Sequence, residues 1–349
     1  MTPSPVLSVE QLSVRFRMPA GRFVEAVTDA TFSLAPGECL ALVGESGCGK
    51  SVLASALLGL LTGNAETAGS ARLADGLDVL AADERTLARS VRGRRIGMVP
   101  QSPAAHLTPV RTVRAHLEET VRELAAGAGR AASATAAGPR PPGPPGPAPG
   151  PGGSERPARR KRFGRAALRA AAEAAGERAA FPATHLDRHP HELSGGLAQR
   201  AATALALVGD APLLLADEPT TGLDRDLVRR TVDELRAHTR EAGRALLRIT
   251  HDLAAAERIA DTVAVMYAGR IVEIAPAGAF FGSSGPRHPY ARGLLDALPE
   301  RAFTPVPGAP PELGALPAGC AFAARCAAAD QTCRSRRPVL TEGVACHRA

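Results

Sequence analysis

The chain has 349 residues, 45% of them hydrophobic, which is enough to bury a sizeable core and suggests about two domains. Its net charge of +7 permits an anionic partner but does not identify one. It contains no run of about 18 apolar residues, and the opening "MTPSPVLSVEQ" lacks a basic stretch followed by an apolar one. We therefore expect a cytosolic chain with neither a membrane span nor a signal peptide.

The first 60 residues combine short β segments with a glycine-rich turn. Strand-like "VLSVEQLSVRF" and "AVTDATFSLAPGECLALVG" lead into "GESGCGKS", and the apolar helical stretch "SVLASALLGLL" follows. The spacing G-x-x-x-x-G-K-S between a strand and a helix predicts a phosphate-binding loop rather than a plain glycine turn. We expect its backbone N–H groups to surround phosphates, Lys50 to neutralise them and the Ser51 hydroxyl to bind Mg²⁺. The loop residues are Gly44, Glu45, Ser46, Gly47, Cys48, Gly49, Lys50 and Ser51.

The middle of the chain, residues 103–200, has a helical pattern with a biased insertion. The insertion spans about 126–164 and is dense in Pro, Gly and Ala, so it is predicted to be disordered or polyproline-like. It ends in the basic run "RPARRKRFGR", which we interpret as a solvated linker. Contact with the anionic inner face of a membrane is the less favoured alternative.

Acidic and polar residues follow several apolar strands in the rest of the chain. "LLLADEP" places Asp217 and Glu218 at a strand end, where Asp217 is expected to hold Mg²⁺ and Glu218 to polarise the attacking water. Gln101 in "RIGMVPQSP" and His251 in "LLRITHD" occupy equivalent positions. Gln101 is a candidate contact for the metal or the water, and His251 for the γ-phosphate. Apolar strands alternating with helices indicate a mostly parallel sheet covered on both faces.

The stretch "HELSGGLAQR" predicts a helix that begins at Ser194. A helix N-terminus offers unpaired N–H groups, and Gly195 and Gly196 have no side chains, so a phosphate can approach closely. One nucleotide is already assigned to residues 44–51. The second anion site is therefore predicted to serve the nucleotide of another subunit.

Together these motifs resemble those of the ATP-binding subunits of ABC transporters, over about residues 6–300 apart from the insertion. The resemblance implies an α/β P-loop NTPase with a RecA-like ABC ATPase core in 1–102 and 201–275, a helical subdomain in 103–200 and an extension in 276–349. It also implies a role for each motif: Walker A for Gly44 to Ser51, Q-loop for Gln101, signature for Ser194 to Gly196, Walker B for Asp217 and Glu218, D-loop for Asp224 and switch histidine for His251. Leu197 departs from the commoner Gln after "LSGG". An adenine-stacking aromatic is expected near residues 16–23, with Phe23 preferred over Phe16.

More narrowly, "GESGCGKS", "HPHELSGG" and "RHPYARGLLDALP" resemble the branch that imports dipeptides, oligopeptides or nickel. The resemblance implies ATP and Mg²⁺ as ligands, a second ATPase subunit, identical or homologous, and two integral-membrane permeases. An extracytoplasmic solute-binding protein would act indirectly, and the chain would lie on the cytoplasmic face of the membrane. No nucleic acid is expected.

Four cysteines lie in the C-terminal tail: Cys320, Cys326, Cys333 and Cys346. Their intervals match no familiar zinc finger, and zinc prefers closer pairs of ligands. The looser spacing is compatible with an iron–sulfur cluster. Similarity to the extension of peptide-type ABC ATPases favours a [4Fe–4S] cluster over zinc or free thiols, and the absence of any metal remains an equal alternative.

Two other classes of protein compete with the transporter interpretation. A soluble ABC-type ATPase acting on nucleic acid or ribosomes would explain the basic run, but such proteins usually carry tandem nucleotide domains and this chain has one set of motifs. A regulatory subunit with an inactive site is disfavoured because every motif is intact.

Overall fold

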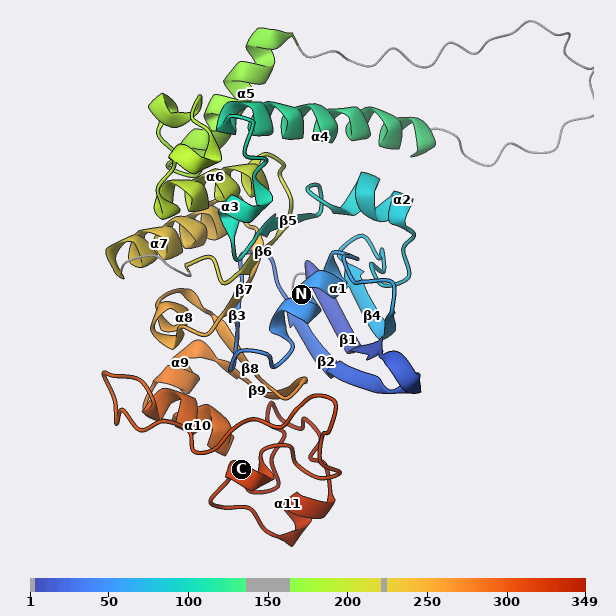
Figure 1. Ribbon diagram of the computed structural model, residues 1–349, viewed down its shortest axis with the longest axis vertical. Coiled ribbons are helices and arrows are strands. Elements are labelled where there is room, and N and C mark those ends of the chain that lie inside the picture. Colours follow the sequence, from blue (N-terminus) through green and yellow to red (C-terminus); the bar gives the residue numbers. More distant parts are fainter. Residues whose placement is uncertain (1–3, 136–163, 221–224) are drawn as a thin grey trace, which may run out of the picture.

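The computed structural model describes residues 4–135, 164–220 and 225–349, and this part of the chain is built around two β-sheets (Figure 1). The larger sheet is parallel except for its last pair, in which β8 and β9 run antiparallel. The expected α/β fold is thereby confirmed. In spatial order its strands are β5 (Ile96–Val99), β6 (Leu213–Asp217), β7 (Ala245–Thr250), β3 (Cys39–Val43), β8 (Thr262–Tyr267) and β9 (Arg270–Pro276).

The central strands of this sheet are buried on both faces. Every residue of β3, β6 and β7 is buried, as expected for apolar strands that lie between layers of other structure. Because these strands are parallel, their carboxyl ends lie at one edge of the sheet, where open α/β sheets bind ligands.

The smaller sheet is antiparallel and comprises β2 (Phe23–Leu34), β1 (Leu7–Arg17) and β4 (Ala65–Leu73) in that order. In β1, Leu7, Val9, Leu12 and Val14 are buried and contribute to one hydrophobic cluster with Leu53 of α1. This sheet therefore packs against the helix that follows the glycine-rich loop. The strand β4 was not predicted from the sequence.

The helices, in chain order, are α1 (Lys50–Leu57), α2 (Glu84–Thr86), α3 (Pro103–His106), α4 (Val113–Thr135), α5 (Arg165–Arg178), α6 (Gly195–Leu207), α7 (Arg225–Ala242), α8 (Leu253–Ile259), α9 (Ala277–Phe281), α10 (Pro289–Asp296) and α11 (Gln331–Ser335). A second hydrophobic cluster joins residues of α4, α5, α6 and α7 to the larger sheet. In α7, a strongly charged helix, Val232 and Leu235 face this cluster because they lie three residues apart on one side. None of the helices in the described ranges is both long and apolar enough to cross a bilayer.

The last quarter of the chain packs against β8 and β9 through a third cluster. Figure 1 shows this extension, with α10 and α11, at the end of the molecule opposite α4 and α5. Its core contains Tyr267, Tyr290 and Phe322, whose rings contact one another. The extension thus shares a hydrophobic core with the larger sheet and is not a separate tail.

Two predicted boundaries need correction. Residues 126–135 were assigned to the insertion, but the structure continues α4 through Thr135, because this Ala-rich stretch has high helix propensity. Residues 136–163 of the insertion lie outside the described residues. The predicted boundary between residues 200 and 201 falls within α6, whose buried face is continuous from Ala198 to Leu207. The remaining division into core, helical subdomain and extension stays a prediction.

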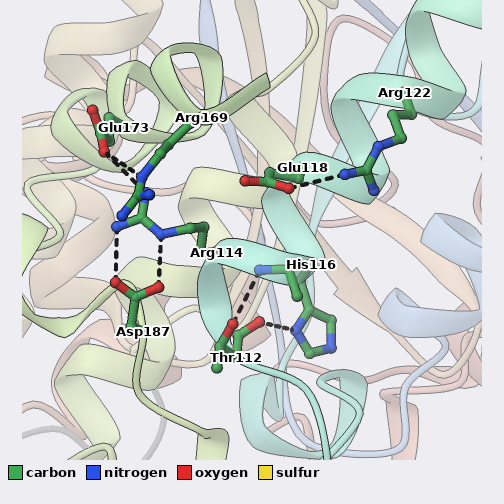
Figure 2. Close-up of polar contacts among 9 residues, drawn as sticks. Thr112, Arg114, His116, Glu118, Arg122, Arg169, Glu173 and Asp187 are labelled. Atoms are coloured by element: carbon green, nitrogen blue, oxygen red, sulfur yellow. Dashed lines mark hydrogen bonds and ion pairs between the residues drawn. The ribbon is translucent and has the colours of Figure 1, made fainter. Parts of the chain in front are cut away.

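One arginine ties the start of α4 to the rest of the helical region (Figure 2). Arg114 donates from Nε and Nη2 to the two carboxylate oxygens of Asp187, at 2.7 and 3.0 Å, and from Nη1 to Glu173 in α5 at 2.9 Å. Its side chain is only 13% exposed, so the guanidinium is largely withdrawn from water. These hydrogen bonds hold the pKa of the Asp187 carboxyl below its usual range.

We predict that Arg114→Gln lowers the free energy of unfolding by about 1–3 kcal/mol, because three charge-assisted hydrogen bonds of a largely buried group are lost. Chemical denaturation of the full chain measures this. The matched control is Arg122→Gln, which removes a single ion pair with Glu118 one turn away in α4 (Figure 2); because the Arg122 side chain is 50% exposed, this should cost less than about 0.5 kcal/mol. Equal effects of the two substitutions would contradict the special role given to Arg114.

Candidate functional site

The glycine-rich loop connects the end of β3 to the start of α1. Gly49 immediately precedes α1 with φ +107°, and a Cβ there would lie 2.2 Å from the carbonyl oxygen of Ala26 in β2. Only glycine satisfies both the backbone conformation and the close approach. The smaller sheet therefore fixes the position of the loop from one side.

The Lys50 side chain lies inside this loop and is 4% exposed. Its Nζ donates to the carbonyl oxygens of Gly44 and Glu45, at 2.8 and 2.9 Å, and lies 3.8 Å from Cys48 Sγ. Burial raises the pKa of the Cys48 thiol, whereas the Lys50 charge lowers it. The loop thus surrounds the Lys50 ammonium group, whose positive charge can neutralise a bound phosphate.

Asp217 ends β6 and is 7% exposed. Burial and the neighbouring Glu218 raise the pKa of its carboxyl, while a hydrogen bond to the Ser51 side chain and the charge of Lys50 lower it. Its Oδ1 has no hydrogen-bond partner among the described residues. A buried carboxylate oxygen beside a serine hydroxyl has the chemistry of a Mg²⁺ ligand set, so these residues fit that ion.

The structure brings Gln101, Glu218 and His251 together. Gln101 Nε2 donates to Glu218 Oε2 at 3.1 Å, and His251 Nδ1 lies 3.2 Å from Glu218 Oε1. The Glu218 side chain is 12% exposed, and its backbone has φ +43°, unusual for a residue with a side chain. The backbone N–H of Glu218 donates to the Ile249 carbonyl at 2.9 Å. Residues that follow β5, β6 and β7 therefore converge on one carboxylate.

Ser194 caps the N-terminus of α6, and its hydroxyl accepts a hydrogen bond from the Leu197 N–H at 3.4 Å. Ser194 and Gly195 are exposed, as a second anion site requires. Gly196 is buried, and a Cβ there would lie 2.2 Å from the side chain of Leu227 in α7. Gly196 therefore has a packing role between two helices, and its predicted contact with a phosphate stays a prediction.

The remaining predicted nucleotide contacts are less completely described. Phe23 is 38% exposed at the start of β2, with the Arg15 guanidinium carbon 4.5 Å from its ring centre. Phe16 is partly buried against the core, so Phe23 is the more accessible of the two rings. Asp224 lies outside the described residues.

The four tail cysteines line one cavity between the start of α10 and α11: Cys320, Cys326, Cys333 and Cys346. Burial raises the pKa of the Cys320 thiol, and the other three cysteines add to this shift. Within the described ranges, no three His, Cys, Asp or Glu side chains are grouped so as to hold a single metal ion. The thiols therefore surround a shared cavity without converging on one point.

Two contacts of the loop were missed by the sequence analysis. Glu45 binds Tyr290 and Arg325, which are 245 and 280 residues away along the chain. Tyr290 lies in the segment "RHPYARGLLDALP", but nothing in that segment or around Arg325 indicates a contact with residues so far away in the sequence.

Comparison with known proteins identifies the family. The family described as ABC transporter matches residues 27–221, and the family described as oligopeptide/dipeptide transporter, C-terminal region, matches residues 272–333. The chain belongs to the ABC transporter family. The second match covers Cys320, Cys326 and Cys333 but ends before Cys346.

Curated ABC relatives resemble the chain over nearly its whole length. It is 36% identical to the oligopeptide transport ATP-binding protein OppD of Mycobacterium bovis, over 99% of this chain but only 51% of that protein. It is also 36% identical to a putative peptide import ATP-binding protein of Brucella abortus, over 97% of this chain and 94% of that protein. The chain thus spans about half of the first of these relatives and almost all of the second.

Solved ABC structures share the fold. A dimeric ATP-binding cassette bound to ADP and phosphate matches with a TM-score of 0.62 at 20% identity, covering 78% of this chain and 98% of that one. The cassette cbiO1 of Clostridium perfringens matches with a TM-score of 0.59 at 22% identity, covering 80% of this chain and 92% of that one. Both confirm the predicted α/β cassette fold.

Proposed function

We propose that this ABC subunit binds and hydrolyses MgATP, and that hydrolysis energises a membrane importer of dipeptides or oligopeptides. Hydrolysis is supported by one observation above all: Gln101 and His251 both contact the Glu218 carboxylate. A carboxylate whose two oxygens are each held by a neighbour is oriented to accept a proton from a water molecule.

The proposed mechanism assigns one task to each group. Lys50 binds the outer phosphates from inside the loop, and Glu218 takes the proton of the attacking water while Gln101 and His251 fix its orientation. Asp217 and Ser51 would hold Mg²⁺, which neutralises charge on the phosphates when bound. Ser194 and Gly195 at the start of α6 would complete the ATP site of a second subunit.

The proposal that the substrate is a peptide is based on the similarity to relatives. The OppD and Brucella proteins are named for oligopeptide transport and peptide import, and the extension matches the C-terminal family of such transporters. The partners in this proposal are a second ATPase subunit and two integral-membrane permeases, which would place the chain at the cytoplasmic face of the membrane. No described feature favours nickel or nucleic acid.

The tail cysteines are proposed to hold a [4Fe–4S] cluster. A [4Fe–4S] cluster is held by four cysteine thiolates. Four cysteines line one cavity of the extension and would hold it: Cys320, Cys326, Cys333 and Cys346. When bound, the cluster would link four segments of the extension, two of which are also joined by the hydrogen bond from the Cys320 N–H to the Cys333 carbonyl.

Co-purification from native membranes tests the transporter part of the proposal. The full chain with Glu218→Gln should retain bound ATP and, after solubilisation with ATP and Mg²⁺, carry two multi-span membrane proteins with it. Those proteins, reconstituted with wild-type chain and any second ATPase subunit recovered with them, should take up labelled dipeptides or oligopeptides in an ATP-dependent manner.

Two other outcomes of that experiment would contradict the proposal. Recovery of ribosomal or nucleic-acid material without a membrane partner would overturn the importer. Uptake of Ni²⁺ but not of peptides by the reconstituted complex would overturn the substrate class while leaving the transporter in place.

A further inference from the structure

The C-terminal extension reaches the phosphate loop through one buried arginine. Arg325 lies at the end of a 3₁₀ turn, Ala323–Arg325, and its side chain is only 4% exposed. Its Nη1 donates to Glu45 Oε2 at 2.8 Å and its Nη2 donates to Glu45 Oε1 at 3.0 Å. This two-point pairing fixes both the position and the plane of the Glu45 carboxylate.

The Arg325 side chain is also held in position by contacts other than Glu45. Its Nε donates to the Pro307 carbonyl at 2.6 Å, and its guanidinium carbon lies 5.7 and 5.8 Å from the ring centres of Tyr267 and Phe322. Hydrogen bonds to Glu45 and Tyr267 keep the pKa of the guanidinium above its already high usual value, despite burial. Exposed ion pairs contribute little to stability because water and salt screen them. The Arg325–Glu45 pair differs from these because the Arg325 side chain is held in one position and is withdrawn from water.

The backbone of Glu45 connects its fixed side chain to the centre of the phosphate loop. Its backbone N–H donates to Tyr290 Oη at 2.9 Å, and its carbonyl oxygen accepts a hydrogen bond from Lys50 Nζ at 2.9 Å. The chain contains only two tyrosines, and both lie in this cluster. Glu45 therefore connects the extension, through its side chain and its N–H, to the lysine of the phosphate loop.

We propose that Arg325 is a positioning residue for ATP binding: by fixing Glu45 it sets the conformation of the loop that holds Lys50. The inference rests on the proposed ATP site in residues 44–51. The extension is then a structural component of the nucleotide site, in addition to any role that it has in the cysteine cavity. Arg325 does not touch the nucleotide in this proposal, so its effect is on ATP affinity and not on the chemical step.

A double-mutant cycle on the full-length chain tests this. Steady-state ATP hydrolysis is measured for wild type, Arg325→Gln, Glu45→Gln and the double substitution, with the melting temperature of each recorded. Each single substitution should raise the KM for ATP about tenfold and leave kcat within about twofold, because a loop displaced from the phosphates loses binding. The double substitution should raise the KM no further, since both changes break the same contact.

The matched control is Arg334→Gln, which changes an exposed arginine of the same extension and should leave KM unchanged. If Arg325→Gln does not fold, Arg325→Lys completes the cycle, because it keeps the charge and loses the two-point geometry; its KM should then rise by about threefold. Unchanged KM, additive effects, or a fall in kcat alone would each overturn the proposal for Arg325. A wild-type chain that neither binds nor hydrolyses ATP would instead overturn the proposed function and remove the basis of this inference.

Discussion

Replacing Glu218 with glutamine is expected to lower kcat for ATP hydrolysis by about 10²–10⁴-fold while ATP remains bound. The amide has the size of the carboxylate and still accepts a hydrogen bond from Gln101, but it cannot take a proton from water. Because Lys50, Asp217 and Ser51 are unchanged, ATP affinity should stay within a few-fold of wild type. Steady-state turnover and equilibrium binding of ATP in the presence of Mg²⁺ measure the two quantities separately.

The control for this substitution is Glu257→Gln, an exposed carboxylate in α8, which should hydrolyse ATP at the wild-type rate. A Glu218→Gln protein that turns over within a few-fold of wild type would show that another group activates the water. Loss of ATP binding together with turnover would mean that the substitution disturbs the loop, and the assignment of Glu218 as the base would lose its support.

Cys326→Ser is expected to remove the iron–sulfur cluster from the extension. A chain purified without oxygen should contain about four irons and four sulfides and absorb visible light, and one missing thiolate leaves a corner of the cluster without its protein ligand. We expect the variant to lose most of its iron, sulfide and visible absorption. Metal and sulfide analysis of the purified full chain measures this directly.

Cys39→Ala provides the matched control, because Cys39 is buried in β3 and belongs to a different hydrophobic cluster. Burial raises the pKa of the Cys39 thiol to about 12, so it stays protonated. This variant should keep the cluster. Wild-type chain that contains zinc without sulfide, or no metal at all, would refute the [4Fe–4S] proposal.

The local motifs were readable from the sequence because each depends on a short range of contacts. The loop "GESGCGKS" follows a strand and opens a helix, and Ser194 caps α6 through a bond to a residue three positions later. Apolar runs at residues 213–218 and 245–252 predicted buried strands for the same reason, since covering layers on both faces demand continuous apolar sequence, and the structure places β6 and β7 there. The boundary of α4 was missed because Ala-rich helix and Ala-rich linker have similar composition.

Spacing and local propensity specify the fold class, the phosphate loop, the start of α6 at its capping serine and the polar residues at the strand ends, so these features could be predicted before the chain was folded. The folded structure was needed to show that Gln101 and His251 contact the same Glu218 carboxylate, that Gly196 packs on Leu227 and that Arg325 binds Glu45. The first of these contacts follows from the parallel order of the sheet, the second from packing of α6 on α7, and the third from packing of the extension on β8 and β9. Such contacts between residues distant in the chain leave no period or spacing in the sequence, so they emerge only when the elements are assembled.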